Sequence, residues 1–205
     1  MIAVLDYDCG NLRSVSKALE YLGYETIVTR EAADIARASR VILPGVGAFA
    51  DAIRLFKQSD GGRLEPALRD AVARGKPVLG ICLGMQIMAL GSDEDGWHDG
   101  LGLFDASVTR FPPDAGKVPH MGWNRIASRG GSLLDGADGE YVYFVHSYRI
   151  AGAHEWTAAS CDYGGAFTAA VQRGNLCATQ FHPEKSGAAG LRILRNFAAM
   201  EAGTC

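Results

Sequence analysis

The first half of the chain alternates apolar strand patterns with helical patterns, and this alternation limits the possible folds more than any other feature. The predicted strands are residues 2–7, 25–29, 40–43 and 77–79, and the predicted helices are residues 11–22, 31–38, 47–56 and 64–74. Strands that alternate with helices form a parallel sheet that is covered by helices on both faces. The pattern therefore predicts an α/β fold.

The second half changes character and predicts an extension of this sheet by antiparallel strands. Residues 91–100 are polar and predict a loop. Short strands are predicted at residues 106–110, 124–127, 141–150, 157–161, 167–172 and 176–181, and a closing helix at residues 186–202. Because no linker or internal repeat interrupts the chain, we expect one domain over residues 1–205, with a mostly parallel sheet, flanking helices and antiparallel extension strands.

Charge and hydropathy argue against several classes of partner. The formal net charge is −3 and no two Lys or Arg residues are adjacent, which argues against nucleic acid. No apolar run approaches the ~18 residues of a membrane helix, and the N-terminal residues lack the basic start of a signal peptide. The five cysteines are odd in number, widely spaced and without a C-x-x-C pair, so we expect neither disulfides nor a metal, and a cytoplasmic location.

A candidate nucleophile lies in the segment Gly80-Ile81-Cys82-Leu83-Gly84. An apolar strand pattern precedes this segment and a buried helix pattern follows it. A sharp strand-to-helix turn forces its central residue toward positive φ and requires small neighbours, as in the elbow of hydrolases. The turn also directs the side chain to a helix N-terminus, which favours a thiolate. Taken alone, the segment fits a buried inert thiol equally well.

The base that such a thiol requires is predicted at His182, with Glu184 to orient it. His182 follows the last predicted strand, and the carboxyl ends of parallel strands are where sites assemble. Glu184 lies two residues further and shares a side of an extended chain with His182. By itself this pair would be interpreted as a surface ion pair at a strand end. The combination with Cys82 favours catalysis.

Acyl transfer also needs N–H groups that stabilise an oxyanion. The N–H of Leu83, directly after the candidate nucleophile, is one candidate. The segment Pro44-Gly45-Val46-Gly47 follows a predicted strand and offers the N–H of Val46 or Gly47 as a second. A plain glycine turn is the alternative for this segment.

Three separated motifs in one order carry a resemblance to a known family. They are Pro44-Gly45-Val46-Gly47-Ala48-Phe49, Gly80-Ile81-Cys82-Leu83-Gly84-Met85-Gln86 and Phe181-His182-Pro183-Glu184. The chain resembles the class I glutamine amidotransferases over nearly its whole length, which implies a flavodoxin-like domain. Met85 occupies a position at which other branches of this class, the anthranilate and GMP synthase glutaminases, commonly have histidine. Together with residues 118–124 and 143–148, it makes the chain most similar to the glutaminase subunits of imidazole glycerol phosphate synthases.

The resemblance implies a role for each matching position. Cys82 would attack the side-chain amide of L-glutamine, His182 would carry the proton, and Glu184 would orient His182, with no cofactor. Glutamine would be held by Gly47, Gln86, Ser147 and Tyr148. A cyclase subunit, the partner in a heterodimer, would be contacted by Asn11, His120, Met121, Trp123 and Lys185. The chain departs from the family pattern at Asp8 and Cys9, where glycine and methionine are common.

Two other functions share these motifs. A related glutaminase could supply ammonia for the amidation of surface sugars, and a catalytically silent subunit could only stabilise a partner. The chain lacks a G-x-x-x-x-G-K-[ST] loop and other phosphate-binding motifs for an acceptor. Either the chain is a plain hydrolase, or a second protein binds the acceptor against it. The exposed apolar character expected at residues 120–124 favours a second protein that covers this segment.

Overall fold

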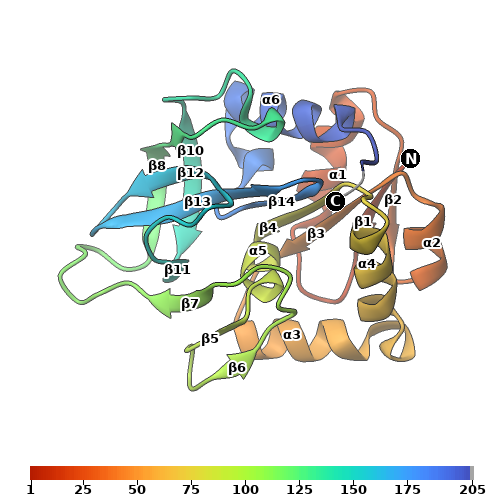
Figure 1. Ribbon diagram of the computed structural model, residues 1–205, viewed down its shortest axis with the longest axis horizontal. Coiled ribbons are helices and arrows are strands. Elements are labelled where there is room, and N and C mark those ends of the chain that lie inside the picture. Colours follow the sequence, from red (N-terminus) through yellow and green to blue (C-terminus); the bar gives the residue numbers. More distant parts are fainter. Residues whose placement is uncertain (204–205) are drawn as a thin grey trace.

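The computed structural model describes residues 1–203, so Cys205 and the end of the expected domain lie outside the described residues. An eight-stranded sheet forms its centre (Figure 1), in the order β2-β1-β3-β4-β14-β13-β12-β9. The parallel strands are β1 (Ile2–Leu5), β2 (Thr26–Thr29), β3 (Arg40–Gly45), β4 (Val78–Cys82) and β14 (Leu176–Thr179). The antiparallel strands are β13 (Ala166–Arg173), β12 (Thr157–Asp162) and β9 (Ala127–Ser128). The predicted fold class is confirmed.

Helices cover both faces of the sheet, as Figure 1 shows. On one face lie α1 (Leu12–Tyr21) and α6 (Gly187–Ala199). On the other lie α3 (Phe49–Gln58), α4 (Leu64–Ala73) and α5 (Leu83–Met88), with α2 (Ala32–Arg37) packed beside α4. Short 3-10 helices are η1 (Ser59–Gly62), η2 (Ser132–Leu134) and η3 (Pro183–Lys185). None of the helices in residues 1–203 has the length and apolar character that a membrane crossing requires.

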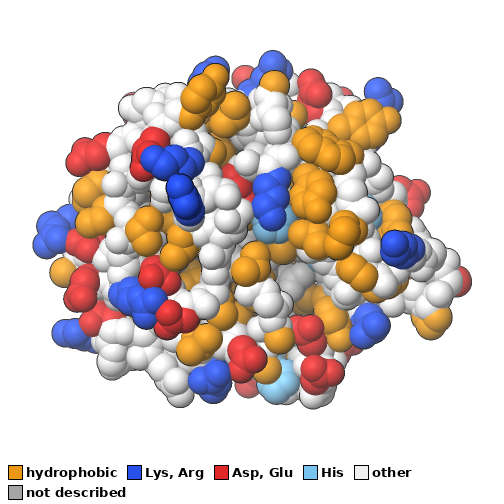
Figure 2. All heavy atoms as spheres, turned by 180° about the vertical axis from the view of Figure 1, so that it is seen from behind, with side chains coloured by type: hydrophobic (Ala, Val, Ile, Leu, Met, Phe, Trp, Pro, Cys, Tyr) orange, Lys and Arg blue, Asp and Glu red, His pale blue; other side chains and the backbone are white. Residues whose placement is uncertain are grey.

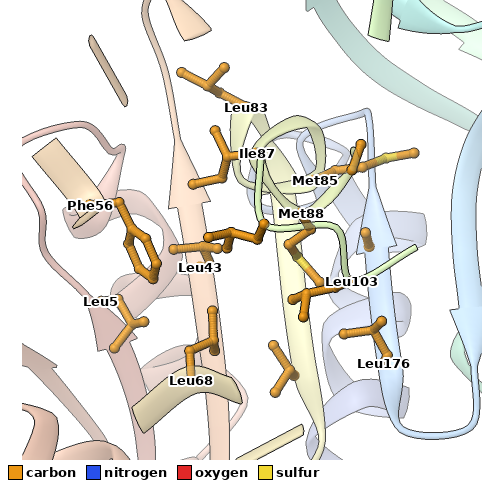
Figure 3. Close-up of a cluster of buried hydrophobic side chains, with 14 of the residues drawn as sticks. Leu5, Leu43, Phe56, Leu68, Leu83, Met85, Ile87, Met88, Leu103 and Leu176 are labelled. Carbon is orange, nitrogen blue, oxygen red and sulfur yellow. The ribbon is translucent and has the colours of Figure 1, made fainter. Parts of the chain in front are cut away.

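Alternation along the strands divides the core between the two faces. Ala3 and Leu5 of β1 belong to the cluster under α3, α4 and α5, whereas Ile2 and Val4 belong to the cluster under α1 and α6. Figure 3 shows Leu5 and Leu43 facing Phe56 and Leu68, with residues of α5 above them. Burial on both faces explains why the parallel strands appear as continuous apolar runs in the sequence.

Two smaller sheets correct the prediction for the second half. The expected strand 141–150 is two strands, β10 (Tyr141–His146) and β11 (Tyr148–Ile150), with a bend at Ser147. β10 pairs with β8 (His120–Arg125), and β11 pairs with β7 (Ser107–Arg110). Apolar and aromatic residues occur on both sides of the bend, so the sequence does not reveal the change of partner strand.

The predicted loop 91–100 is also not entirely irregular. It contains β5 (Gly91–Ser92) and β6 (His98–Asp99), which pair antiparallel, and β5 adds to the sheet of β7 and β11. Strands of two residues carry too little periodicity for a sequence pattern.

Candidate active site

The strand-to-helix elbow predicted around Cys82 is present. β4 ends at Cys82, α5 begins at Leu83, and Cys82 has φ 54° and ψ −110°. The flanking glycines are needed for space: a Cβ atom on Gly84 would lie 1.8 Å from the carbonyl oxygen of Leu43, and one on Gly80 would lie 2.5 Å from the sulfur of Met88. The strained backbone holds the Cys82 side chain between the sheet edge and the first turn of α5.

His182 and Glu184 lie beside Cys82 because of the sheet order. β14 pairs in parallel with β4, so both strands end at the same edge. His182 follows β14, and its Nδ1 is 2.8 Å from Oε1 of Glu184, with both side chains buried. Because a carboxylate oxygen only accepts, Nδ1 carries the hydrogen. Nε2 of His182 has no hydrogen-bond partner among residues 1–203.

The surroundings of His182 favour its protonated form. Burial by itself would lower the pKa of the imidazole, but attraction to the Cys82 sulfur and to the Glu184 carboxylate outweighs burial and raises the pKa to about 9. A histidine held in this way by a carboxylate can accept the proton of a thiol and later return it.

A cavity of about 300 Å³ opens over Cys82. It is lined by Val46, Gly47, Cys82, Leu83, Gln86, Glu94, Pro119, Val145, His146, Ser147, Tyr148 and His182. All the residues predicted for catalysis, for the oxyanion and for glutamine therefore meet here, except Glu184, which lies behind His182. Gly47 has φ 112° and Val46 is exposed. The individual roles stay predictions.

A second histidine at this cavity is neutral. His146 Nδ1 donates to the carbonyl oxygen of Tyr148 at 2.8 Å, and its Nε2 lies 3.0 Å from Nδ1 of His120. Since Nδ1 of His146 carries the hydrogen, its Nε2 accepts from His120. Burial is the main cause that lowers the pKa of His146 to about 3 and the pKa of His120 to about 4.

Two polar side chains at the site were missed by sequence reasoning. Glu94, in the segment predicted as a loop, lines the cavity, and its Oε2 accepts from the N–H of Phe49 at 2.7 Å. Gln180 is fully buried, and its Nε2 lies 3.7 Å from Sγ of Cys82. Gln180 lies two residues before His182 at a strand end, and this spacing could have predicted that its side chain faces the same site.

The expected partner-facing residues occupy different environments. Met121 and Trp123 are 61% and 51% exposed, and Lys185 is exposed with its Nζ 5.8 Å from the ring centroid of Tyr143. Asn11 is half-buried and donates to Oε1 of Glu184 at 3.2 Å, which links it to the His182 pair.

For His120 the expectation of a partner-facing side chain is wrong. The side chain is 2% exposed and stacks between Tyr163 and Phe144, with ring centroids 4.0 and 4.8 Å away. The reason is the alternation of β8, which turns Met121 and Trp123 outward and His120 inward.

The departure at Asp8 has a structural explanation. Asp8 has φ 68°, a conformation in which glycine is normally preferred. Its carboxylate accepts hydrogen bonds from Arg30, which also pairs with Asp6, and the hydrogen bond to Arg30 lowers the pKa of Asp8. Asp8 thus adopts the glycine-like turn and adds a surface ion pair.

Comparison with known proteins places the chain in a family whose activity is compatible with the geometry of this site. The sequence model of the family "Glutamine amidotransferase class-I" matches residues 3–200. The chain belongs to this family. Among the solved structures of similar fold are a glutamine amidotransferase, with a TM-score of 0.74, and PurLQS from Thermotoga maritima, with a TM-score of 0.71. The first is 23% identical to this amidotransferase and the second 19%, and each comparison covers 96% of both chains.

Closer relatives narrow the branch of the family. The amidotransferase is 51% identical to the imidazole glycerol phosphate synthase subunit HisH of Rhodopirellula baltica, over 97% of each chain. It is 49% identical to the HisH subunit of Syntrophotalea carbinolica, over 98% of this chain and all of the relative. The HisH subunit of Archaeoglobus fulgidus is 48% identical, over 96% of this chain and 97% of the relative.

Proposed function

We propose that this chain is the glutaminase subunit of an imidazole glycerol phosphate synthase and releases ammonia from L-glutamine through a thioester on Cys82. The observation that carries the proposal is the arrangement around the cavity. Cys82 stands on a strained elbow next to His182, whose Nε2 has no hydrogen-bond partner within residues 1–203, while Glu184 holds Nδ1 at 2.8 Å. The relatives that share about half of its residues over their full length are HisH subunits.

These positions support the following reaction. His182 Nε2 takes the proton of Cys82, and Sγ attacks the amide carbon of glutamine. The N–H of Leu83, in the first turn of α5, and the N–H of Val46 or Gly47 stabilise the oxyanion. His182 then gives its proton to the leaving nitrogen, so that ammonia departs and a γ-glutamyl thioester remains. His182 then deprotonates a water molecule, which adds to the thioester. The C–S bond breaks, glutamate is released, and the proton on His182 returns to the Cys82 sulfur.

The cavity offers complementary groups to the amino-acid end of glutamine. Glu94 contributes a carboxylate to the lining, and this matches the ammonium group of the substrate. The lining also includes Gln86, Ser147, Tyr148 and Gly47, which offer amide, hydroxyl and backbone groups. We propose that these residues position the side-chain amide over Cys82.

We propose that the outer face of the β8–β10 ribbon binds the cyclase subunit, which uses ammonia to form imidazole glycerol phosphate and an aminoimidazole carboxamide ribotide. Figure 2 shows hydrophobic side chains gathered on the part of the surface where β8 and β10 lie. The outer face carries Met121, Trp123, Tyr141, Tyr143 and Val145, which alternate with buried or half-buried residues along these strands. Val145 also lines the cavity. A partner on this face would shield the path of ammonia from water.

A coupled glutaminase assay tests the proposal. Glutamate release is measured for the chain alone, then with the cyclase subunit, then with the cyclase and its nucleotide ligand. We expect weak activity alone, a strong increase in the liganded complex, and loss of activity in Cys82→Ser. High activity of the chain alone without a response to the cyclase would overturn the coupled function. Rescue of a histidine auxotroph separates it from a glutaminase for sugar amidation.

A further inference from the structure

A network of buried hydrogen bonds ends at the sulfur of Cys82. Which of its groups donate and which accept can be derived from one backbone atom. The carbonyl oxygen of Tyr148 can only accept, and Gln86 lies 3.0 Å from it. The Gln86 atom at this contact must therefore be the amide nitrogen, Nε2. This fixes the orientation of the Gln86 amide without reference to its other neighbours.

The same nitrogen fixes the next amide. Nε2 of Gln86 lies 3.0 Å from the side-chain amide of Gln180, and because Nε2 only donates, the atom that faces it is Oε1 of Gln180. The other end of the Gln180 amide is then Nε2, which lies 3.7 Å from Sγ of Cys82. The network thus presents a donor to the sulfur.

The surroundings leave Gln180 little freedom to turn. Its side chain is 0% exposed, so its amide groups must find their partners within the protein. Its backbone N–H donates to Ala169 at 2.8 Å, which holds it at the end of the sheet. His146 also donates to the Tyr148 carbonyl from which the direction is derived, at 2.8 Å.

The charged and titratable groups around Cys82 come from several elements. His182 follows β14, Glu94 follows β5, and His146 ends β10. Tyr7, which follows β1, is buried and donates its hydroxyl hydrogen to Pro44 at 2.7 Å. His182 becomes the cation beside the sulfur once it has taken the proton of Cys82. A neutral donor beside it would stabilise negative charge on sulfur without adding a second positive charge to the cavity.

We propose that Gln180 is a further catalytic residue, whose amide N–H donates to the Cys82 sulfur and stabilises the thiolate. This rests on the proposed nucleophilic role of Cys82. Sulfur carries negative charge twice in the reaction: before the S–C bond forms, after its proton has moved to His182, and again when the C–S bond of the thioester breaks. A donor on sulfur favours both states.

The test compares Gln180→Met, which removes the donor at similar side-chain length, with the wild-type chain. The rate of Cys82 alkylation by iodoacetamide is measured against pH in the complex with the cyclase. The modification is quantified on the proteolytic peptide that contains Cys82, so that the other cysteines do not contribute. We expect the pH of half-maximal rate to rise by about one unit, which at pH values below both midpoints is a tenfold lower fraction of thiolate. Glutaminase kcat should fall about tenfold, with KM changed less than about threefold.

Thr179→Val is the matched control. It removes a buried hydrogen bond of the neighbouring residue, from Oγ1 to the carbonyl oxygen of Phe181 at 3.0 Å, without touching the sulfur. The alkylation midpoint of this variant should equal that of the wild type. If Gln180→Met does not fold, Gln180→Asn withdraws the amide from the sulfur and should also raise the midpoint.

The outcomes separate the two proposals. An unchanged midpoint in a folded Gln180 variant overturns the role of Gln180 and leaves the role of Cys82 intact. If wild-type Cys82 is not alkylated and Cys82→Ser keeps its glutaminase activity, the proposed function itself fails.

Discussion

At the scale of single residues, the two imidazoles that line the same cavity have pKa values shifted in opposite directions. His182 donates from Nδ1 to a carboxylate, and its pKa is raised to about 9. His146 donates from Nδ1 to a neutral carbonyl and accepts from His120, and its pKa is lowered to about 3. The partner of Nδ1 therefore distinguishes a proton carrier from a neutral structural group, although both histidines are buried.

The buried neutral pair predicts a loss of stability in acid. The folded-state pKa values of His120 and His146 lie below the unfolded value of 6.5, so their contribution is complete above pH 6.5. It is lost as pH falls toward about 4 for His120 and about 3 for His146. Between pH 7.5 and 5.0 each histidine should cost up to about 2 kcal/mol of the free energy of unfolding. Urea unfolding of His120→Phe, which cannot titrate, should show a smaller acid loss than the wild type. An equal acid loss would contradict the assignment.

The carboxylate of Glu94 predicts a binding effect. Glu94→Gln keeps an oxygen that can accept from Phe49 N–H but removes the charge that we assign to the substrate ammonium. We expect KM for glutamine to rise about tenfold or more, with kcat changed much less, because a charge-assisted hydrogen bond is worth roughly 1.5–3 kcal/mol. Steady-state kinetics of the complex measure this. A KM equal to that of the wild type would remove Glu94 from the substrate site.

At the scale of secondary-structure elements, the elbow depends on how closely β3 approaches α5. The carbonyl oxygen of Leu43 occupies the space that a side chain on Gly84 would need, and a Cβ atom on Gly45 would lie 2.7 Å from the N atom of Gly84. The helix that begins at Leu83 can therefore lie against the sheet edge only if both contact positions are glycine.

This contact predicts the cost of adding one methyl group. Gly84→Ala places Cβ 1.8 Å from a backbone oxygen that no rotamer change can move. We expect the free energy of unfolding to fall by about 3 kcal/mol or more, measured by urea denaturation, together with loss of glutaminase activity. Gly203→Ala, whose Cβ would meet Asn175 at an ordinary 3.4 Å, is the control and should change stability by less than about 0.5 kcal/mol. Equal stability of the two variants would refute this explanation of the elbow.

At the scale of the whole molecule, the cavity and the β8–β10 ribbon lie next to each other. β10 turns His146 inward to the cavity wall and Tyr143 outward beside Trp123, whose ring centroid is 6.0 Å away. A partner bound to the outer face would therefore lie one side-chain layer from the reacting groups. Figure 2 shows that hydrophobic side chains gather in this part of the surface.

Two exposed tryptophans allow a matched test of this surface. Trp123→Ala should weaken the complex with the cyclase about 10- to 100-fold, because large aromatic residues at the centre of an interface commonly contribute about 2 kcal/mol or more. Trp97 is 55% exposed but lies in the β5–β6 turn, and Trp97→Ala should leave the affinity unchanged. Calorimetric titration of both variants measures the difference. Equal effects of the two substitutions would show that β8 is not the docking strand.

The sequence by itself determined the alternating strands and helices, the Gly-flanked Cys82, and the pairing of His182 with Glu184 two residues away. These features depend on local periodicity and on short spacing, which a linear pattern records. Only the tertiary structure decided that 141–150 bends at Ser147, that His120 is buried, and that Gln180 faces Cys82 across 98 residues of sequence. The reason is that strand pairing and buried hydrogen bonds join segments distant in sequence, and no local pattern specifies their partners.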